Sequence, residues 1–329
     1  MPKVTVVIPA YNAGHTLGPT LGSVINQTFE DWEALVVDDG STDDTADVAV
    51  AFKDPRIHVI HQQNRGLAGA RNTGIRKARG SLIALLDADD LWHPQKLEKH
   101  VAHLDARPEV GVSFSVSEMV DGQGHRLGYC QKPRLRGLDA SAILCRNPVG
   151  NGSAAVVRKA TLRDVVFVDP SLGGRGLREP WFFDERLRQS EDVELWVRIA
   201  ATTSWKFEGL AEPLTLYRVH AGGLSADVDT QYRTWSRMLD KVATFAPDLV
   251  ASYGRPARAY QLRYLARRAV RSRDGRRAWT FLADALRADW RIAVWEWQRT
   301  SATAAAVLLL RVLPLNLYCR LEKRAMAFA

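Results

Sequence analysis

Cysteines, long apolar runs and glycine-rich loops are all scarce in this 329-residue sequence. The three cysteines, Cys130, Cys145 and Cys319, show neither an even count nor metal-ligand spacing, which favours a reducing cytosol over a disulfide framework. No G-x-G-x-x-G follows a predicted strand, so the signature of a Rossmann oxidoreductase is missing. A sugar nucleotidyltransferase would need a glycine-rich basic loop after the first strand, where "PAYNAGHT" has one glycine.

Signals for secretion and membrane insertion are also weak. The N-terminus "MPKVTVVIPAYN" lacks the charged start, long apolar stretch and cleavage site of a signal peptide, so we expect a cytoplasmic protein. The most apolar run, Ala302–Tyr318, falls short of the roughly 20 residues that a spanning helix needs. Arg311 and Pro314 interrupt it, which argues further against a spanning helix.

Positive charge is concentrated in the C-terminal part of the chain. Residues 251–329 contain 16 Lys/Arg and 5 Asp/Glu, a net charge of +11, which leaves −3 for residues 1–250 out of a total of +8. The near-neutral body argues against nucleic acid as a partner. The basic tail, with Trp290, Trp295 and Trp297 before its apolar run, is compatible with peripheral contact with an anionic membrane. The alternative is a helix that packs on the rest of the chain or in a homodimer.

The first 110 residues alternate between strand-like and helix-like hydrophobic periods. The predicted strands are Val4–Pro9, Glu33–Asp39, Ile57–Ile60 and Ser81–Asp87, and the predicted helices cover residues 16–28, 45–52, 66–78 and 94–104. This order is typical of βαβ units, so the predicted fold class is α/β, with a mostly parallel central sheet flanked by helices. Residues 111–225 mix the two periods, and the sequence after Gln231 is nearly all helical in pattern.

Polar side chains follow three of these strands, at Pro9–Asn12, Asp38–Asp39 and Asp87–Asp90. Ligands of parallel sheets bind beyond the carboxyl ends of the strands, so we expect one site at this edge. The stretch "LLDADDLW" is the most unusual of the three, because it places three carboxylates within four positions. Their mutual repulsion is unfavourable unless a cation relieves it.

Three interpretations of this acidic stretch compete. Asp90 could cap a helix N-terminus, but one cap needs one carboxylate. A calcium loop of the EF-hand type is disfavoured because its spacing and its glycine are absent. The interpretation that we favour is a Mg²⁺ or Mn²⁺ site that holds a substrate diphosphate, since such an ion binds one or two carboxylates together with phosphate oxygens.

Five segments stand in an order that resembles one family. They are "VTVVIPAYNAG", "VVDDGSTDDT", "NRGLAGARNTG", "LLDADD" and "SEDVELWVRI", and together they resemble the family 2 glycosyltransferases with the GT-A fold. The resemblance spans Val4 to His220 and implies a nucleoside diphosphate sugar as donor, usually a UDP-sugar, and inversion at the anomeric carbon. It implies a catalytic domain over residues 1–225, with a nucleotide-binding half up to residue 110 and an acceptor-binding half after it. Residues 226–329 would form a C-terminal helical region.

The resemblance also implies roles for particular residues. The nucleotide would be bound by Pro9, Ala10, Tyr11, Asn12, Asp38, Asp39, Arg71, Asp87 and Ala88, with Asp39 as the acceptor for the base N–H. A Mn²⁺ or Mg²⁺ ion would be bound by Asp89, with Asp87 and His220 as further candidates. The catalytic pair would be Glu191 and Asp192, with Asp192 as the base that deprotonates the acceptor hydroxyl. The acceptor would be a glycan, a lipid-linked sugar or a small molecule.

Each assignment has a simpler alternative. Arg71 could be a solvated helix residue, Asp38 could only support its loop, and His220 could be structural. Ser190 or Asp192 could cap the helix that follows. The aromatic stretch 181–183 could stack on an acceptor sugar or belong to the local core. For the whole chain, the alternative is an inactive scaffold of the same fold that binds nucleotides or glycans.

Overall fold

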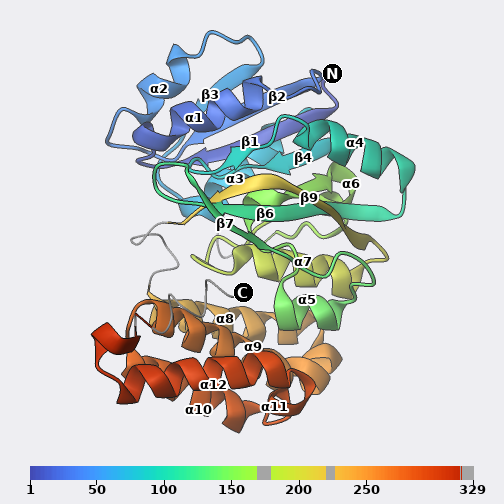
Figure 1. Cartoon of the computed structure of the whole chain (residues 1–329). Helices are drawn as coiled ribbons and strands as arrows, with labels where there is room; N and C mark the ends of the chain where they lie inside the picture. Colours follow the sequence, from blue (N-terminus) through green and yellow to red (C-terminus); the bar gives the residue numbers. More distant parts are fainter. Residues whose placement is uncertain (169–178, 220–226, 319, 321–329) are drawn as a thin grey trace. The chain divides into compact units, whose positions relative to one another are not determined.

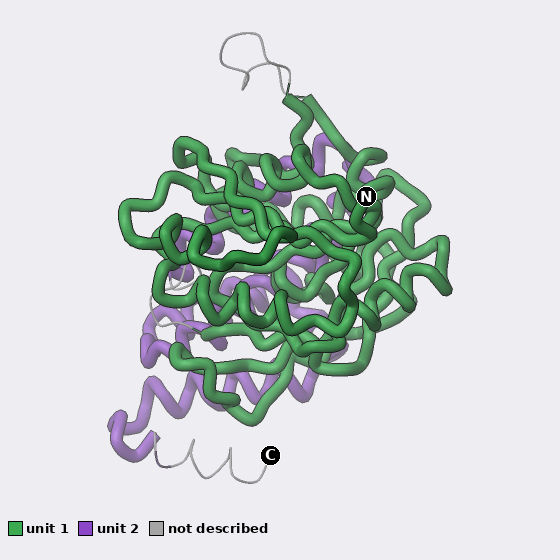
Figure 2. Tube along the Cα trace, turned by 90° about the horizontal axis from the view of Figure 1, so that it is seen from above, with its two compact units in different colours: residues 1–143, 147–224 green, residues 144–146, 225–329 purple. Residues whose placement is uncertain are grey.

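The computed structural model describes residues 1–168, 179–219, 227–318 and 320. The chain forms two compact units (Figure 2). The first contains residues 1–143 and 147–224, and the second contains residues 144–146 and 225–329. Each unit has its own hydrophobic core.

A nine-stranded sheet is the centre of the first unit (Figure 1). Its strands are β1 (Val4–Ala10), β2 (Trp32–Asp38), β3 (Ile57–His61), β4 (Leu82–Leu85), β5 (Leu91–Trp92), β6 (Val110–Val120), β7 (Arg126–Gln131), β8 (Ala155–Arg158) and β9 (Lys206–Arg218). The spatial order is β3-β2-β1-β4-β8-β6-β9-β5, and β7 pairs with β6 outside this path. The β3-β2-β1-β4 half is parallel, as the βαβ pattern predicts.

The second half of the sheet is mixed. Strand β8 runs antiparallel to both β4 and β6, whereas β6 and β9 are parallel. The short strands β5 and β7 pair antiparallel with β9 and β6. Neither short strand was expected, because β5 has two residues and β7 is largely exposed, so neither shows a hydrophobic period.

The helices that precede β9 in the chain are α1 (Gly14–Ile25), α2 (Thr45–Ala51), α3 (Gly66–Lys77), α4 (Lys96–Ala106), α5 (Ala140–Arg146), α6 (Lys159–Asp164) and α7 (Glu191–Thr202). All belong to the first unit except the last three residues of α5, which are assigned to the second. Strand β1 is buried along its whole length because helices cover both of its faces. Val6 shares a core cluster with Leu17 of α1. Val7 points to the other face, where Gly74 lets α3 approach so closely that a Cβ there would lie 2.3 Å from the Val7 side chain.

The second unit is helical in its described part. Its helices are α8 (Val228–Phe245), α9 (Pro247–Arg271), α10 (Gly275–Ala288), α11 (Ile292–Trp295) and α12 (Trp297–Val312). Alanine and leucine side chains such as Leu262, Leu265 and Ala285 fill its core. Trp290, Trp295 and Trp297, which precede the apolar run, are exposed. In the ranges that the structure describes, every helix is too short or too polar to cross a bilayer.

Candidate functional site

The loops after β1 and β2 are tied to each other by hydrogen bonds. The Asn12 backbone N–H donates to Ser41 Oγ at 3.0 Å, and the Thr42 N–H donates to Asn12 Oδ1 at 2.8 Å. Asn12 has a left-handed φ of 49°, a conformation that asparagine tolerates better than most residues. Tyr11 is 52% exposed beside it, whereas Pro9 and Ala10 are buried at the end of β1. Tyr11 and Asn12 therefore offer the open polar and aromatic surface at this strand end.

Asp38 and Asp39 both organise local backbone. Asp38 Oδ1 accepts from the Ser41 N–H, and its Oδ2 lies 3.0 Å from His61 Nδ1. Burial opposes the ionisation of Asp38, but the hydrogen bonds from Ser41 and His61 outweigh it and lower the pKa of the carboxyl. The structure therefore shows the loop-supporting contacts that were the alternative reading of this residue.

Asp39 accepts three hydrogen bonds at the start of α3. They come from Gln62 Nε2 at 2.6 Å, the Arg65 N–H at 2.8 Å and the Gly66 N–H at 2.8 Å. Because Asp39 is only 2% exposed, most of its hydrogen-bonding capacity is committed to the protein. Its role as acceptor for a nucleotide base stays a prediction.

Arg71 connects two acidic motifs that are far apart in the sequence. Its Nη1 donates to Glu191 Oε1 and its Nη2 donates to Asp87 Oδ1, each at 2.7 Å. The residue is 2% exposed, so the reading of Arg71 as a solvated helix arginine is wrong. Burial alone would lower its pKa, but the charges of Asp87 and Glu191 outweigh burial and raise it. Gly152 makes room for the guanidinium, since a Cβ there would lie 2.5 Å from Nη2.

The carboxylates at the start of α7 have raised pKa values. Burial raises the pKa of Glu191 to about 7 against the opposing charge of Arg71, and the charge of Asp192 contributes to the rise. Burial also raises the pKa of Asp192, again opposed by Arg71. A carboxyl group whose pKa is raised toward neutral is better suited to proton transfer than an ordinary one.

The helix α7 does not begin with a side-chain cap at Ser190. Ser190 has a left-handed φ of 63° and makes no capping hydrogen bond through its side chain, so that alternative is wrong. Asp192 Oδ1 does accept from the Val193 N–H at 2.8 Å. Asp192 therefore has one oxygen directed at the first turn of α7, which is compatible with a second role for the other oxygen.

Asp90 has a structural role that differs from the predicted cap. The helix α4 begins at Lys96, so Asp90 is too far upstream to cap it. Its Oδ1 accepts from the Arg218 N–H at 2.8 Å and its Oδ2 from Ser153 Oγ at 2.6 Å. Burial raises the pKa of Asp90 well above its usual value, and the charges of Asp89 and Asp87 add to this. Asp90 therefore joins β9 and the turn before β8 to the acidic stretch.

The remaining members of the acidic stretch lie at the carboxyl end of β4. The Asp87 N–H donates to Ser153 Oγ, and the carbonyl oxygen of Asp89 accepts from Arg218 Nε at 2.6 Å. Ala88 is buried, and its carbonyl accepts from Thr20 Oγ1. The backbone of this stretch is thus held from three sides, while the side chain of Asp87 remains 24% exposed.

The donor set fits a divalent ion only in part. Within the described ranges, no three or more His, Cys, Asp or Glu side chains gather in an arrangement that could bind a metal. His220 lies outside the described residues. Asp87 and Asp89 supply the hard oxygen donors that Mg²⁺ and Mn²⁺ prefer, and such ions commonly complete their coordination with substrate phosphates and water. The residues therefore fit an ion that binds together with a phosphorylated ligand, and they do not form a preformed cage.

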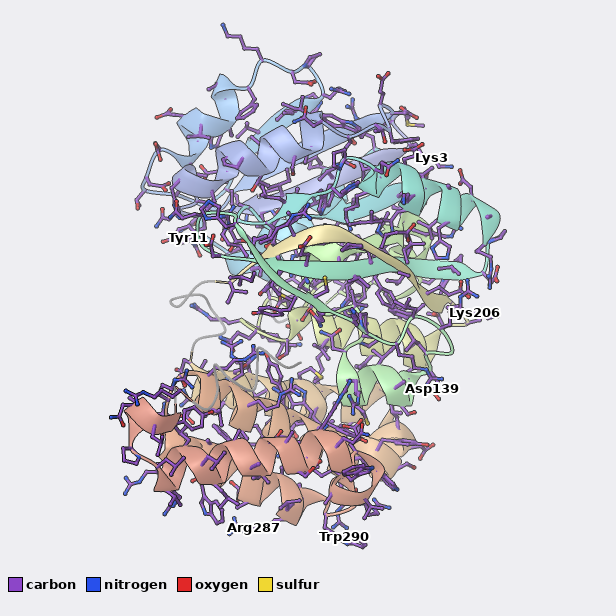
Figure 3. All side chains as sticks on the ribbon, in the orientation of Figure 1. Lys3, Tyr11, Asp139, Lys206, Arg287 and Trp290 are labelled. Atoms are coloured by element: carbon purple, nitrogen blue, oxygen red, sulfur yellow. The ribbon has the colours of Figure 1, made fainter. Side chains whose placement is uncertain are left out.

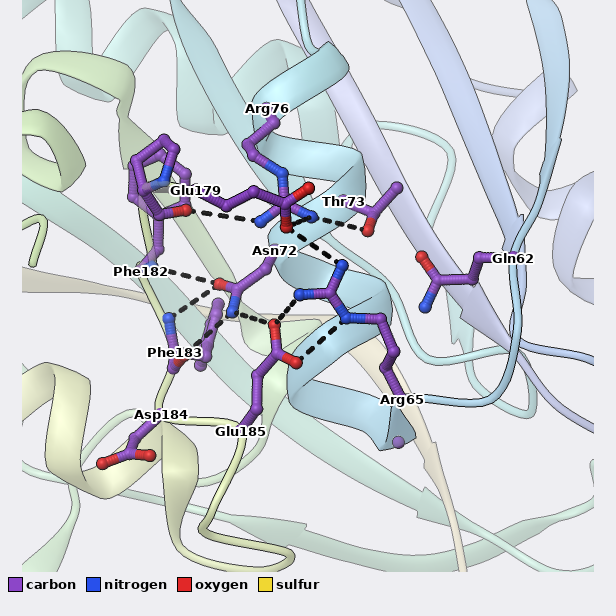
Figure 4. Close-up of polar contacts among 12 residues, drawn as sticks. Gln62, Arg65, Asn72, Thr73, Arg76, Glu179, Phe182, Phe183, Asp184 and Glu185 are labelled. Atoms are coloured by element: carbon purple, nitrogen blue, oxygen red, sulfur yellow. Dashed lines mark hydrogen bonds and ion pairs between the residues drawn. The ribbon is translucent and has the colours of Figure 1, made fainter. Parts of the chain in front are cut away.

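A second polar network holds the segment before α7 against α3 (Figure 4). Asn72 Oδ1 accepts from the Phe182 and Phe183 N–H groups, and its Nδ2 donates to the Phe183 carbonyl and to Glu185. Arg65 donates to both carboxylate oxygens of Glu185 at 2.9 and 3.1 Å. Trp181, Phe182 and Phe183 are 6%, 7% and 0% exposed, so they belong to the local core and are not open to an acceptor sugar.

This network was not predicted from the sequence. Arg65 and Asn72 stand in the same "NRGLAGARNTG" segment as Arg71, and the spacing of seven places them on one face of a helix. That spacing was a usable signal for a shared polar face. The partner Glu185 lies 113 residues after Asn72 and carries no local signal.

The mixed sheet with flanking helices is a fold of the GT-A class. TarS from S. aureus, solved in complex with UDP-GlcNAc, has a TM-score of 0.60 at 17% identity and covers 87% of this chain and 81% of its own. The mannosyltransferase PcManGT from Pyrobaculum calidifontis, solved with GDP-Man and Mn²⁺, has a TM-score of 0.54 at 21% identity, over 94% and 86% of the two chains. At these identities the likeness concerns the fold.

The family assignment is more specific. Residues 5–166 match the family described as "Glycosyl transferase family 2", and this part of the chain belongs to that family. An uncharacterized glycosyltransferase from Rickettsia bellii is 30% identical over 218 residues, which are 66% of this chain and 29% of the relative. The Escherichia coli protein "UDP-Glc:alpha-D-GlcNAc-diphosphoundecaprenol beta-1,3-glucosyltransferase WfgD" is 43% identical over 100 residues, 30% of this chain and 40% of the relative. The chain thus spans well under half the length of these relatives.

Proposed function

We propose that the chain is a metal-dependent inverting glycosyltransferase that moves a sugar from a nucleoside diphosphate sugar to a hydroxyl group. The observation that carries the proposal is the position of Arg71, which holds Asp87 and Glu191 by one guanidinium at 2.7 Å each. This pairing brings the acidic stretch after β4 together with the carboxylate pair at the start of α7. A donor-binding motif and a proton-accepting motif are thereby adjacent, as transfer between two bound substrates requires.

The donor nucleotide would bind at the carboxyl ends of β1, β2 and β4. Tyr11 and Asn12 offer exposed surface there, and Asp38 and Asp39 stabilise the loops around it. Asp87 and Asp89 would hold Mn²⁺ or Mg²⁺ when it binds with the diphosphate, and the ion would neutralise negative charge on the leaving nucleotide. A UDP-sugar is the donor that we favour, because TarS binds UDP-GlcNAc and WfgD is named for UDP-Glc.

Asp192 is the residue that we propose as the general base. Glu191 is already held by Arg71, whereas Asp192 shows one hydrogen bond from its own helix and keeps a second oxygen for a substrate proton. An alcohol is a poor nucleophile, and removal of its proton during attack is the help that a carboxylate with a raised pKa can supply. In an inverting transfer, the base acts from the face opposite the leaving group. Glu191 would position Asp192 by joining the start of α7 to Arg71.

The acceptor that we propose is a glycan or a lipid-linked sugar of the cell envelope. The name of WfgD contains a diphosphoundecaprenol acceptor, and a relative from Bacillus subtilis, 41% identical over 109 residues (32% of this chain, 43% of the relative), is named a putative teichuronic acid biosynthesis glycosyltransferase. The exposed Trp290, Trp295 and Trp297 of the second unit support peripheral membrane contact, with a homodimer as the alternative.

The proposal is tested by separating donor binding from transfer. We expect Asp192→Asn to bind UDP and Mn²⁺ like the wild type in calorimetry, but to lose about 10²- to 10⁴-fold in transfer rate, the usual effect of removing a general base. Asp89→Ala should lose the Mn²⁺-dependent part of UDP binding. Asp47→Ala, which removes an exposed carboxylate from α2, is the matched control and should change neither quantity.

The donor for this assay can be selected by thermal-shift screening of nucleotide sugars with Mn²⁺. Release of UDP that depends on acceptor would support a transferase, whereas binding without turnover would support an inactive scaffold. Full transfer activity in Asp192→Asn would exclude Asp192 as the base. Unchanged UDP and Mn²⁺ affinity in Asp89→Ala would exclude the proposed metal ligand.

A further inference from the structure

A basic hollow lies in the first unit, away from the proposed catalytic residues. Its volume is about 370 Å³, at the small end of the roughly 300–1,000 Å³ of ligand pockets. Five of its lining residues are cationic: Lys3, Arg79, Arg158, Lys159 and Arg163. We infer that this basic hollow binds the phosphate group of an anionic ligand.

The basic hollow is at the opposite edge of the sheet from the proposed active site. Lys3 directly precedes β1, and Tyr11 directly follows it. Eight residue steps along β1 separate these positions, or about 26 Å at about 3.3 Å per residue. Figure 3 shows Lys3 and Tyr11 on opposite sides of the first unit. Arg158 ends β8, which runs antiparallel to β4, and is therefore also at the Lys3 edge, where it pairs with Leu82.

The positive charge of the basic hollow is only partly neutralised. Arg79 pairs with Glu33, and Lys3 pairs with Asp105 at 2.8 Å. Within the described part of the chain, Arg158, Lys159 and Arg163 form no ion pair with a carboxylate. The excess is local, because residues 1–250 together carry a net charge of −3.

The three unneutralised residues differ in what they can offer a ligand. Arg158 donates to the backbone carbonyls of Leu104 and Val110, so it contributes mainly charge. The Lys159 N–H donates to the Ser81 carbonyl, which fixes the start of α6 beside β4. Its Nζ donates to the Ala78 carbonyl at 2.5 Å, which leaves two ammonium N–H groups for a ligand. Burial and then the charge of the neighbouring Arg163 lower the pKa of Lys159, and the charge of Glu33 opposes them only in part, so an anion beside Lys159 would be favourable.

A phosphate group is the ligand chemistry that fits these features. A guanidinium such as that of Arg163 can donate two parallel hydrogen bonds to phosphate, and an ammonium such as that of Lys159 can add a third. A phosphate monoester carries up to two negative charges and a phosphodiester carries one, and both offer more oxygen acceptors to a local excess of cations than a single carboxylate does. The ligand is either a free phosphorylated molecule or the headgroup of an anionic phospholipid, since both present the same group.

The first experiment is calorimetric titration of the full chain with inorganic pyrophosphate in EDTA, so that metal-dependent binding at the proposed active site does not contribute. We expect saturable binding that weakens at least tenfold in Lys159→Gln/Arg163→Gln. The control Lys132→Gln/Arg136→Gln removes the same charge from exposed residues elsewhere and should stay within twofold of the wild type. Absence of saturable binding to the wild type, or equal affinity of the two double variants, would overturn the proposal.

A second experiment distinguishes the two sources of the phosphate group. If the ligand is a lipid headgroup, the wild type should float with phosphatidylglycerol vesicles but not with phosphatidylcholine vesicles, and Lys159→Gln/Arg163→Gln should not float with either. Pyrophosphate binding without such flotation would identify a free phosphorylated ligand, and flotation that the variant retains would overturn the lipid source. The variant should have the unfolding midpoint of the wild type, which would show that it is folded. It should also bind UDP with Mn²⁺ like the wild type, which would show that the basic hollow and the proposed active site bind their ligands independently.

Discussion

Arg71→Met is the substitution that most directly tests the arrangement of the site. In the wild type, the 2% exposed guanidinium pairs with Glu191 and with Asp87 at 2.7 Å each. The substitution preserves much of the side-chain volume but leaves two partly or fully buried carboxylates without their cation. Removing one partner of a buried ion pair typically destabilises a protein by 3–5 kcal/mol.

We expect the lower end of that range, about 3 kcal/mol at neutral pH, because Asp87 is 24% exposed and water relieves part of its charge. For a unit of this size, about 3 kcal/mol corresponds to a decrease of about 6–12 °C in the unfolding midpoint. The decrease should be smaller at pH 5.5 than at pH 8. The charge of Arg71 lowers the pKa of Glu191, so the pKa of this carboxyl is higher in Arg71→Met. At pH 5.5 the carboxyl is then protonated and neutral, and the variant does not bury an unpaired charge at Glu191.

Differential scanning calorimetry at the two pH values measures this effect. Arg71→Met/Glu191→Leu should be more stable than Arg71→Met, because the double variant no longer buries the charge of Glu191. Arg136→Met removes an exposed arginine and should change stability by less than about 0.5 kcal/mol. A loss below about 1 kcal/mol in Arg71→Met, or a double variant that is no more stable than the single one, would refute the reasoning.

Three further predictions concern pH, positioning and metal. Burial raises the pKa of Glu191 to about 7, so the stability that its protonated form contributes is complete below the ordinary pKa of 4.5 and is lost as pH rises through about 7. Glutamine does not titrate, so the unfolding midpoint of Glu191→Gln should rise relative to that of the wild type between pH 5.5 and pH 8. A midpoint difference that is the same at both pH values would contradict this. Asn72→Ala should lower kcat much more than it changes the KM for donor, since Asn72 holds the backbone before α7. Asn72→Asp keeps the acceptor for Phe182 and Phe183 but places a carboxylate against Glu185, so it should lose at least as much kcat; a pure KM effect in Asn72→Ala would argue against positioning. Treatment with EDTA should abolish transfer and Mn²⁺ should restore it, and turnover that persists in EDTA would exclude a required divalent ion.

Apart from β5, the strands and helices of residues 1–110 could be predicted from the sequence, because their signals are local. Strand β1 is buried on both faces and therefore reads as a continuous apolar run, and the predicted end at Pro9 differs from the observed end by one residue. The helix predicted over residues 66–78 is α3, Gly66–Lys77. The mixed pairing in the second half of the sheet was not predicted, because pairing between distant strands leaves no mark in a local hydrophobic period.

The acidic motifs and their order along the chain were also evident from the sequence, since carboxylates after buried strands stand out in composition. What each carboxylate does depended on the tertiary structure. Asp90 became a structural acceptor for Arg218, and Arg71 became a buried bridge, because burial and the approach of residues more than 100 positions away decide which charges meet. Charge interactions strengthen as water is excluded, so only the folded chain reveals which pKa values rise and which side chains remain free to act on a substrate.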